Sequence, residues 1–394
     1  MKNIIISLVI IFIFSACKKD EQTMDKTNSQ ASFVTEQTAF LVSNNFRNEI
    51  KPSRTATSTE KNIFSINKDS QPIMYVINYK EGGFTIISAE NRIEPILAFS
   101  EEGEFAKEDT KYPEGLKTWI NHFGEIISYV RTNNIACPPE ISAIWNNYTK
   151  TPSTDSRAAT PSDDVCEGLD ELRITVGPFL STEWHQEDPF NASLPMIEKE
   201  NGSFMHAFVG CVPIAVAQVL KYHHHPNNYQ WELMPNDNNS ANTYTWELIN
   251  DIHAFINEED TIKYKETGTS VKESFNIATL FTKYFNYTSA VRQSYDRNDA
   301  DDELFIYRRP FIITGVKPTS GGHSWVCDGA KQWYSCIEMD EGNIAARHLY
   351  YHMNWGWDTR EPYTNYNGWF SPSNFTVNGN VYSEDLVMTY QIKP

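Results

Sequence analysis

Residues Gly210–Leu220 read Gly-Cys-Val-Pro-Ile-Ala-Val-Ala-Gln-Val-Leu and organise the second half of the chain. They are apolar on nearly all sides, which predicts a buried helix over about 211–223. Pro213 fits only the first turn of such a helix, where its missing N–H leaves no bond unmade. Cys211 therefore begins the helix, and the helix dipole there favours a thiolate. The alternative is a buried, inert cysteine, the commonest state of an isolated one.

A histidine that can pair with this thiolate lies in the segment 320–329, Ser-Gly-Gly-His-Ser-Trp-Val-Cys-Asp-Gly. The two glycines allow the chain to approach another group closely, and His323 opens an apolar strand predicted near 324–328. A thiolate–imidazolium pair needs a histidine held on such a rigid strand. A hydrogen-bonded core histidine is the alternative, and for a histidine that stands alone it is the more frequent case.

Two amides complete the pattern. Asn354 ends a strand predicted near 348–354, and Trp355 follows it. The amide of Asn354 can form a hydrogen bond that orients the imidazole, and the indole of Trp355 can shield this bond from water. Gln186 lies upstream of Cys211 and can donate to a developing oxyanion, with the backbone N–H of the cysteine as second donor. The alternatives are an aromatic core strand and a solvent-facing glutamine.

The order glutamine, cysteine, histidine, asparagine is that of papain-like cysteine peptidases. The papain string Cys-Gly-Ser-Cys-Trp is absent, and the interval from cysteine to histidine is shorter than in papain. The local strings instead resemble the streptopain family of bacterial cysteine peptidases. In that family Gly-Cys is followed by alanine and glutamine, Gly-His precedes a Val-x-Asp-Gly strand, and Asn-Trp-Gly-Trp follows.

The resemblance implies an α+β papain-like fold, with a helical part around the nucleophile helix and an antiparallel sheet, preceded by a small α+β prodomain. By that resemblance Cys211 is the nucleophile, His323 the general base and acid, and Gln186 an oxyanion donor, while Asn354 and Trp355 support the histidine. The implied protein is a cysteine endopeptidase zymogen that acts on proteins and peptides without a cofactor.

The sequence departs from the family pattern at three places. Pro213 and Cys327 are unexpected, and the loop between Trp357 and Asn367 looks longer than usual. None of these departures removes a catalytic group, but each can alter the shape of the substrate subsites.

The N-terminal residues 31–145 form a separate α+β unit by pattern. The predicted elements are a helix at Thr35–Phe46, strands at Met74–Tyr79, Phe84–Ala89 and Ile96–Phe99, and a helix over Leu116–Val130 with apolar residues at helical spacing. The first two strands flank a Gly82-Gly83 turn and resemble the propeptide hairpin of the same family. The resemblance makes this unit an intramolecular inhibitor.

Residues 146–165 are rich in Thr, Ser, Pro, Asp and Ala and are predicted to be an activation linker. Lys150 and Arg157 would be available there to proteases. The catalytic unit then runs over 166–394. Its further predicted elements are a helix at about 271–286 and a strand near 311–315.

The N-terminus carries a processing signal. Residues 1–16 are a signal peptide, because a basic start precedes an apolar run too short to span a bilayer. The small residues before Cys17 resemble a lipobox, so Cys17 is predicted to be lipidated, with ordinary cleavage as the alternative. Residues 17–30 would then tether an exported outer-membrane lipoprotein, facing the periplasm or the cell surface, whose only membrane contact is the lipid anchor.

Composition excludes other classes of function. The 394 residues carry a net charge of −18, which repels phosphate backbones and argues against nucleic-acid binding. Six cysteines are too few for a disulfide framework, and the five after Cys17 suggest at least one free thiol. The run His223–His225 predicts no metal site, because adjacent residues at a helix end point in different directions.

Two other functions stay open on the sequence. A papain-like acyltransferase would use the same residues with an amine in place of water. A catalytically silent surface lipoprotein would use the fold for binding, although its cysteine, histidine and glutamine are all present.

Overall fold

The computed structural model describes most of the chain from residue 33 onward. The described ranges are 33–50, 60–150, 166–258, 260–272, 274–315, 323–339, 342–360, 364–372, 376–377, 380–381 and 386–394. The predicted signal peptide, Cys17, the tether and Arg157 lie outside these ranges. None of the described helices is long and apolar enough to cross a membrane.

The N-terminal unit is built as an α+β module. Its elements are α1 (Glu36–Ile50), β1 (Glu60–Lys68), β2 (Gln71–Tyr79), β3 (Phe84–Ser88), β4 (Ile96–Ser100), α2 (Glu114–Thr132) and α3 (Pro139–Thr149). All five predicted elements are confirmed, with β1 and α3 added. Helix α3 runs to Thr149, so the first residues of the predicted linker are helical instead. The buried Trp145 and Tyr148 explain this, because they pack the end of α3 against the core.

The region from residue 166 onward begins with short strands and the two longer helices α4 and α5. They are β5 (Ile174–Val176), β6 (Met196–Glu198), β7 (Phe204–His206), α4 (Cys211–His223), α5 (Thr243–Asn257), β8 (Ile262–Lys265), β9 (Gly268–Val271) and α6 (Ile277–Thr279). The helix predicted over 211–223 is confirmed residue for residue, and α5 is an addition.

The remaining elements form most of the sheet. They are β10 (Ser289–Ser294), α7 (Arg297–Asp301), β11 (Phe311–Gly315), β12 (His323–Met339), β13 (Gly342–Asn354), β14 (Gly368–Phe370), β15 (Thr376–Val377), β16 (Asn380–Val381) and β17 (Leu386–Lys393). The strands predicted near 311–315, 324–328 and 348–354 are confirmed, and the last two are longer than predicted. They form one long hairpin, β12–β13, in which Val326 pairs with Asn354.

The helix predicted at about 271–286 is confirmed only over Ile277–Tyr284, the central half of its length. Residues 268–271 are strand β9, and the helical turn starts only at Ile277, where the side chain of Asn276 caps it. Leu280–Tyr284 continues as a π-helical turn. Thr269 and Val271 are β-branched and favour a strand, while an asparagine cap sets a later helix start.

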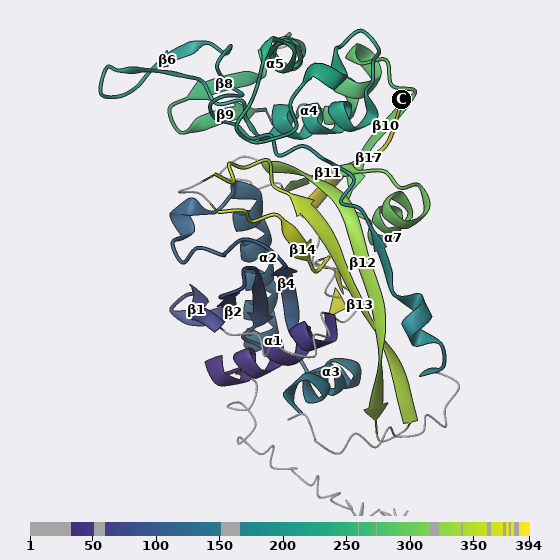
Figure 1. Ribbon diagram of the computed structural model, residues 1–394. Coiled ribbons are helices and arrows are strands. Elements are labelled where there is room, and N and C mark those ends of the chain that lie inside the picture. Colours follow the sequence, from purple (N-terminus) through teal and green to yellow (C-terminus); the bar gives the residue numbers. More distant parts are fainter. Residues whose placement is uncertain are drawn as a thin grey trace, which may run out of the picture. The chain divides into compact units, whose positions relative to one another are not determined.

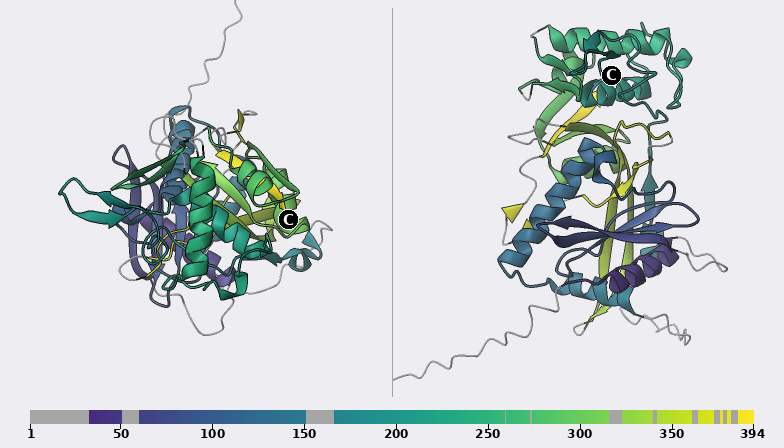
Figure 2. Two further views of the ribbon diagram at one scale, coloured as in Figure 1. Left: turned by 90° about the horizontal axis from the view of Figure 1, so that it is seen from above. Right: turned by 90° about the vertical axis from the view of Figure 1, so that its left-hand side faces the viewer.

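One sheet of eleven strands runs through both halves of the chain, in the order β1-β2-β3-β4-β14-β13-β12-β11-β17-β10, with β5 paired to β12. Strand β4 joins β14 through the pairs Phe99–Trp369 and Ala98–Phe370. Figure 1 shows α4 and α5 beyond one end of the β12–β13 hairpin and α1 and α3 near its other end. The right-hand view in Figure 2 shows the same arrangement, with the purple helix α1 near one end and the teal and green helices near the other. The α+β fold is therefore confirmed, with the N-terminal strands continuing the catalytic sheet.

A disulfide joins the start of the catalytic region to the far part of the hairpin. Cys166 is bonded to Cys336 on β12, with their Cα atoms 5.5 Å apart. Among the described cysteines, Cys137, Cys211 and Cys327 are free thiols. The composition had indicated no disulfide framework, and one bridge with three free thiols agrees with that.

Candidate active site

Cys211 is the first residue of α4, and its side chain is half-buried. Gly210 before it has φ 92°, a left-handed conformation that favours glycine, and its carbonyl accepts the N–H of Ile214. A Cβ at Gly210 would lie 3.2 Å from the carbonyl oxygen of Thr269. The glycine thus lets the chain turn sharply and present the cysteine at the helix start.

The electrostatics around Cys211 differ from the sequence-based expectation. Burial raises the pKa of the Cys211 thiol above its ordinary value, and the Glu114 carboxylate raises it further. Hydrogen bonds from backbone N–H groups, the first being that of Ser324, act in the opposite direction. In this conformation burial therefore outweighs the thiolate-stabilising groups at the helix start.

His323 is the first residue of β12 and has a side chain that is 25% exposed. Its Nε2 lies 3.6 Å from Oε2 of Glu114, the first residue of α2. The other oxygen of Glu114 is 2.5 Å from Nζ of Lys117. The backbone of Ser324, the residue after His323, acts on the pKa of the Cys211 thiol, so the start of β12 lies near Cys211. The start of β12 and the start of α2 therefore both lie near Cys211, and the pairing of Cys211 with His323 stays a prediction.

Asn354 ends β13 and is buried. Its Nδ2 donates to the carbonyl of Thr182 (3.1 Å) and to Oε1 of Gln218 (3.3 Å). Its Oδ1 accepts from Gln218 Nε2 (3.3 Å) and from the N–H of Gly356 (3.0 Å). The amide is held firmly from α4, and its predicted bond to His323 stays a prediction.

Trp355 is also buried, and its shielding role stays a prediction. Its Nε1 donates to the carbonyl of Tyr366 at 2.9 Å, and its ring lies 5.2 Å from that of Trp325 on β12. An added Cβ on Gly115, in the first turn of α2, would lie 2.8 Å from the Trp355 ring. The start of α2 therefore packs closely against the candidate site.

Gln186 lies in an irregular segment before β6, and its side chain is half-buried. Its carbonyl accepts the N–H of Val209 at 2.9 Å, two residues before Cys211. The backbone of Gln186 is thus joined to the segment that leads into the nucleophile. The bond links the two segments through their backbones, and the role of the Gln186 side chain as an oxyanion donor stays a prediction.

Sequence reasoning assigned no role to three groups at this site. Gln218 is the clearest, because it lies seven residues after Cys211, on the same helix face, as a polar side chain in an otherwise apolar run. Glu114 carries no such signal, since a glutamate at a helix start is explained by the helix dipole alone. Asp358 is buried in the loop after Trp357 and also lacks a local signal.

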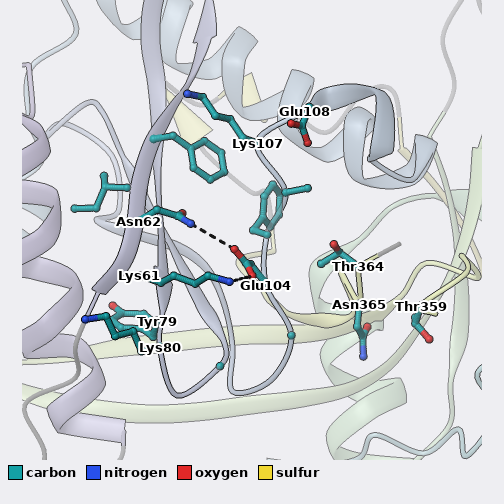
Figure 3. Close-up of a pocket in the computed structure, with 16 residues that line it drawn as sticks. Lys61, Asn62, Tyr79, Lys80, Glu104, Lys107, Glu108, Thr359, Thr364 and Asn365 are labelled. Atoms are coloured by element: carbon teal, nitrogen blue, oxygen red, sulfur yellow. Dashed lines mark hydrogen bonds and ion pairs between the residues drawn. The ribbon is translucent and has the colours of Figure 1, made fainter. Parts of the chain in front are cut away.

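A pocket of about 860 Å³ lies elsewhere, between β1, residues 103–108 and the loop around Asn365. Figure 3 shows Lys61 and Asn62 directed at Glu104, with Nζ–Oε2 and Nδ2–Oε1 distances of 2.6 and 3.4 Å. None of the five predicted catalytic residues lines it. The pocket is therefore separate from the candidate site. Among the described residues, no group of three or more His, Cys, Asp or Glu side chains is placed to hold a metal ion.

Comparison with known families assigns both halves of the chain. The Spi protease inhibitor family matches residues 31–127, and the peptidase C10 family matches residues 184–229 and 227–370. The chain belongs to the C10 family of cysteine peptidases. Because an inhibitor domain precedes the peptidase in the same chain, this C10 peptidase is a zymogen, and its N-terminal unit is the propeptide.

Two curated proteins illustrate the relationship. Streptopain from Streptococcus pyogenes is 25% identical over 328 residues, which cover 72% of this C10 peptidase and 71% of streptopain. The thiol protease/hemagglutinin PrtT from Porphyromonas gingivalis is 22% identical over 375 residues, which cover 83% of this chain but 38% of PrtT. The similarity to streptopain spans most of both proteins.

A solved structure shares the fold. A fragment of prointerpain A from Prevotella intermedia superposes with a TM-score of 0.55 at 19% identity, covering 84% of this chain and 99% of the fragment. The match includes a propeptide form, in agreement with the α+β architecture described above.

Proposed function

We propose that this C10 peptidase is an exported, lipid-anchored endopeptidase that hydrolyses peptide bonds of proteins through Cys211 and His323. The observation that carries the proposal is Cys211 at the start of a buried helix, hydrogen-bonded by the backbone of Ser324, next to His323. Membership of a cysteine peptidase family supplies the reaction class.

The proposed reaction has two steps. The Cys211 sulfur attacks the substrate carbonyl carbon, and Gln186 with the Cys211 N–H stabilises the oxyanion. His323 then protonates the leaving amine as the C–N bond breaks, which leaves a thioester. Water, deprotonated by His323, attacks the thioester, the C–S bond breaks, and the carboxylic acid product leaves with the thiolate restored.

Latency follows from the position of α2. Glu114 lies 3.6 Å from Nε2 of His323, raises the pKa of the Cys211 thiol, and stands at a helix start that packs on Trp355. We propose that this turn keeps a substrate carbonyl away from Cys211 and His323. Cleavage in the linker beyond Lys150, including at Arg157, would detach the propeptide covalently and allow α2 to leave.

The proposal is tested by active-site labelling. The full chain is cleaved in the linker by added trypsin and treated with iodoacetamide, and Cys211→Ala and His323→Ala are treated in parallel. Label at Cys211 in the wild type, with peptide hydrolysis lost in both variants, supports the assignment. An unlabelled Cys211 in a folded, cleaved chain would overturn the role of this cysteine.

Two further arms address maturation and export. If the wild type and Cys211→Ala both persist at full length, or mature equally without added protease, self-processing is wrong. Export as a lipoprotein predicts that the wild type partitions into detergent with a covalently bound acyl chain, while Cys17→Ser stays in the aqueous phase. Equal partitioning of the two would contradict lipidation at Cys17.

A further inference from the structure

The loop that follows Trp357 carries a buried ion pair. Asp358 has a side chain that is only 3% exposed, and Arg360 binds it through two nitrogens, Nε to Oδ1 at 2.8 Å and NH2 to Oδ2 at 2.5 Å. The same NH2 group donates to the carbonyl of Asp188 at 2.7 Å. Hydrogen bonds from Arg360 hold the pKa of Asp358 below its ordinary value, although burial acts the other way. The pair therefore ties this loop to the segment that carries Gln186.

His185, the residue before Gln186, lies against the same pair. It is fully buried, and its Nδ1 accepts the N–H of Glu187 at 3.2 Å. Because Nδ1 is an acceptor, the proton sits on Nε2, which donates to the carbonyl of Asn238 at 3.0 Å. Oδ1 of Asp358 lies 3.8 Å from the same Nε2. Burial lowers the pKa of His185, which agrees with a neutral ring that works as a fixed spacer.

Three hydrogen bonds therefore fix the backbone of residues 186–188. The His185 ring binds the N–H of residue 187, Arg360 binds the carbonyl of residue 188, and the N–H of Val209 binds the carbonyl of Gln186 itself. The second contact comes from the loop that the sequence marks as longer than the family pattern, and Asp358 of the same loop lies 3.8 Å from the His185 ring. An oxyanion donor acts only when it is held within a fraction of an ångström of its place, so such supports affect the rate of the chemical step.

We infer that Asp358, Arg360 and His185 are positioning residues that hold Gln186 in place as an oxyanion donor. The inference rests on the role proposed above for Gln186. The first residues of the long loop then support the oxyanion donor through Asp188 and His185.

The test compares Arg360→Met with Gln186→Ala in the full chain after linker cleavage. Gln186→Ala lowers kcat by about 10²-fold or more, the usual effect of losing one oxyanion donor. Arg360→Met lowers kcat about tenfold or more with KM nearly unchanged, because binding of the ground state is retained. Alkylation of Cys211 by iodoacetamide, which forms no oxyanion, keeps its wild-type rate in both variants.

The double variant makes the inference specific. Arg360→Met added to Gln186→Ala has no further effect on kcat if the arginine acts through the glutamine. Arg347→Met is the matched control. Arg347 pairs with Asp301 at a distance of 3.1 Å, in a part of the protein outside the candidate site, so this substitution should leave kcat unchanged. If Arg360→Met does not fold, Arg360→Lys replaces it, because lysine keeps the charge but loses the two-nitrogen contact.

The outcomes distinguish a failure of the positioning role of Arg360 from a failure of the oxyanion role proposed for Gln186. Equal losses of kcat from Arg360→Met in the wild-type and Gln186→Ala backgrounds overturn the positioning role alone. A parallel loss of alkylation rate overturns it too, since the effect would then be on the nucleophile or the fold. Wild-type kcat in Gln186→Ala overturns the oxyanion role of Gln186, and the inference fails with it.

Discussion

The two ends of the β12–β13 hairpin are both held by a glutamate of the propeptide, but by different chemistry. At the catalytic end, Glu114 lies beside the imidazole of His323, a side chain that can take up or release a proton. At the distal end, Glu49 accepts hydrogen bonds from Trp333 Nε1 and Ser335 Oγ, both at 2.8 Å, and from Tyr148 OH at 2.6 Å. None of these three donors loses its proton near neutral pH.

The surroundings of the two ends differ as well. The distal end is an aromatic cluster in which Phe46 of α1 lies 5.0 Å from Phe99 and about 6 Å from Trp333 and Tyr350, measured between ring centroids. The catalytic end has the half-exposed Glu114 pair and the polar network of Asn354. The distal end is thus held by aromatic packing and a buried acceptor, while the catalytic end brings a propeptide carboxylate to the predicted catalytic histidine.

Phe46→Ala is expected to have the largest effect. It empties the centre of the distal cluster and lowers the free energy of unfolding by about 3–5 kcal/mol. Urea denaturation of the uncleaved chain measures this, with Cys211→Ala present throughout to prevent self-digestion. Phe204→Ala, at a phenylalanine that is 62% exposed, is the matched control and should change stability by less than about 0.5 kcal/mol. Equal effects of the two would remove the distinction between the ends.

Cys336→Ser tests whether the distal end is also fixed from within the catalytic region. The disulfide between Cys166 and Cys336 joins residues that are 170 positions apart in the sequence. Losing this disulfide should lower the free energy of unfolding by about 2–4 kcal/mol. The loss should persist after linker cleavage, because both cysteines lie beyond the linker. Cys137→Ser, which removes a free thiol, serves as the control. An unchanged thermal midpoint for Cys336→Ser would show that the propeptide alone orders this end.

Glu49→Ala leaves three donors without their acceptor and should lower stability by about 1–3 kcal/mol. Denaturation in urea of the chain carrying Cys211→Ala measures the change. The loss should be nearly the same at pH 6 and pH 8, since none of the three partners titrates there. A strong dependence on pH in this range would contradict the contrast drawn between the two glutamates.

Glu114→Gln should change stability least, because a half-exposed ion pair contributes about 1 kcal/mol or less. Its effect is on reactivity. A neighbouring negative charge raises the pKa of a thiol, so removing it lowers that pKa and increases the thiolate fraction at a given pH. Iodoacetamide should then label Cys211 in the uncleaved zymogen several-fold faster at pH 8, with the midpoint of the rate profile at lower pH. A superimposable profile for wild type and variant would argue against Glu114 as the controlling group.

Much of this protein follows from local sequence pattern. The apolar run after Cys211 determines α4, the spacing from Leu116 to Val130 determines α2, and the Gly82-Gly83 turn between β-rich runs determines the β2–β3 hairpin. The order of the four motifs indicates the peptidase family, which the comparisons confirm. The assigned roles of the five site residues stay predictions that the labelling and kinetic experiments test.

The contacts that control the enzyme arise only in the tertiary structure. Glu114 reaches His323, Gln218 binds Asn354, Cys166 joins Cys336, and β4 pairs with β14, all across long separations in sequence. Helix and strand periodicity depends on neighbours a few residues apart, so it is written locally. Which distant polar groups meet is set by how those elements pack, and no residue pattern within either segment records it.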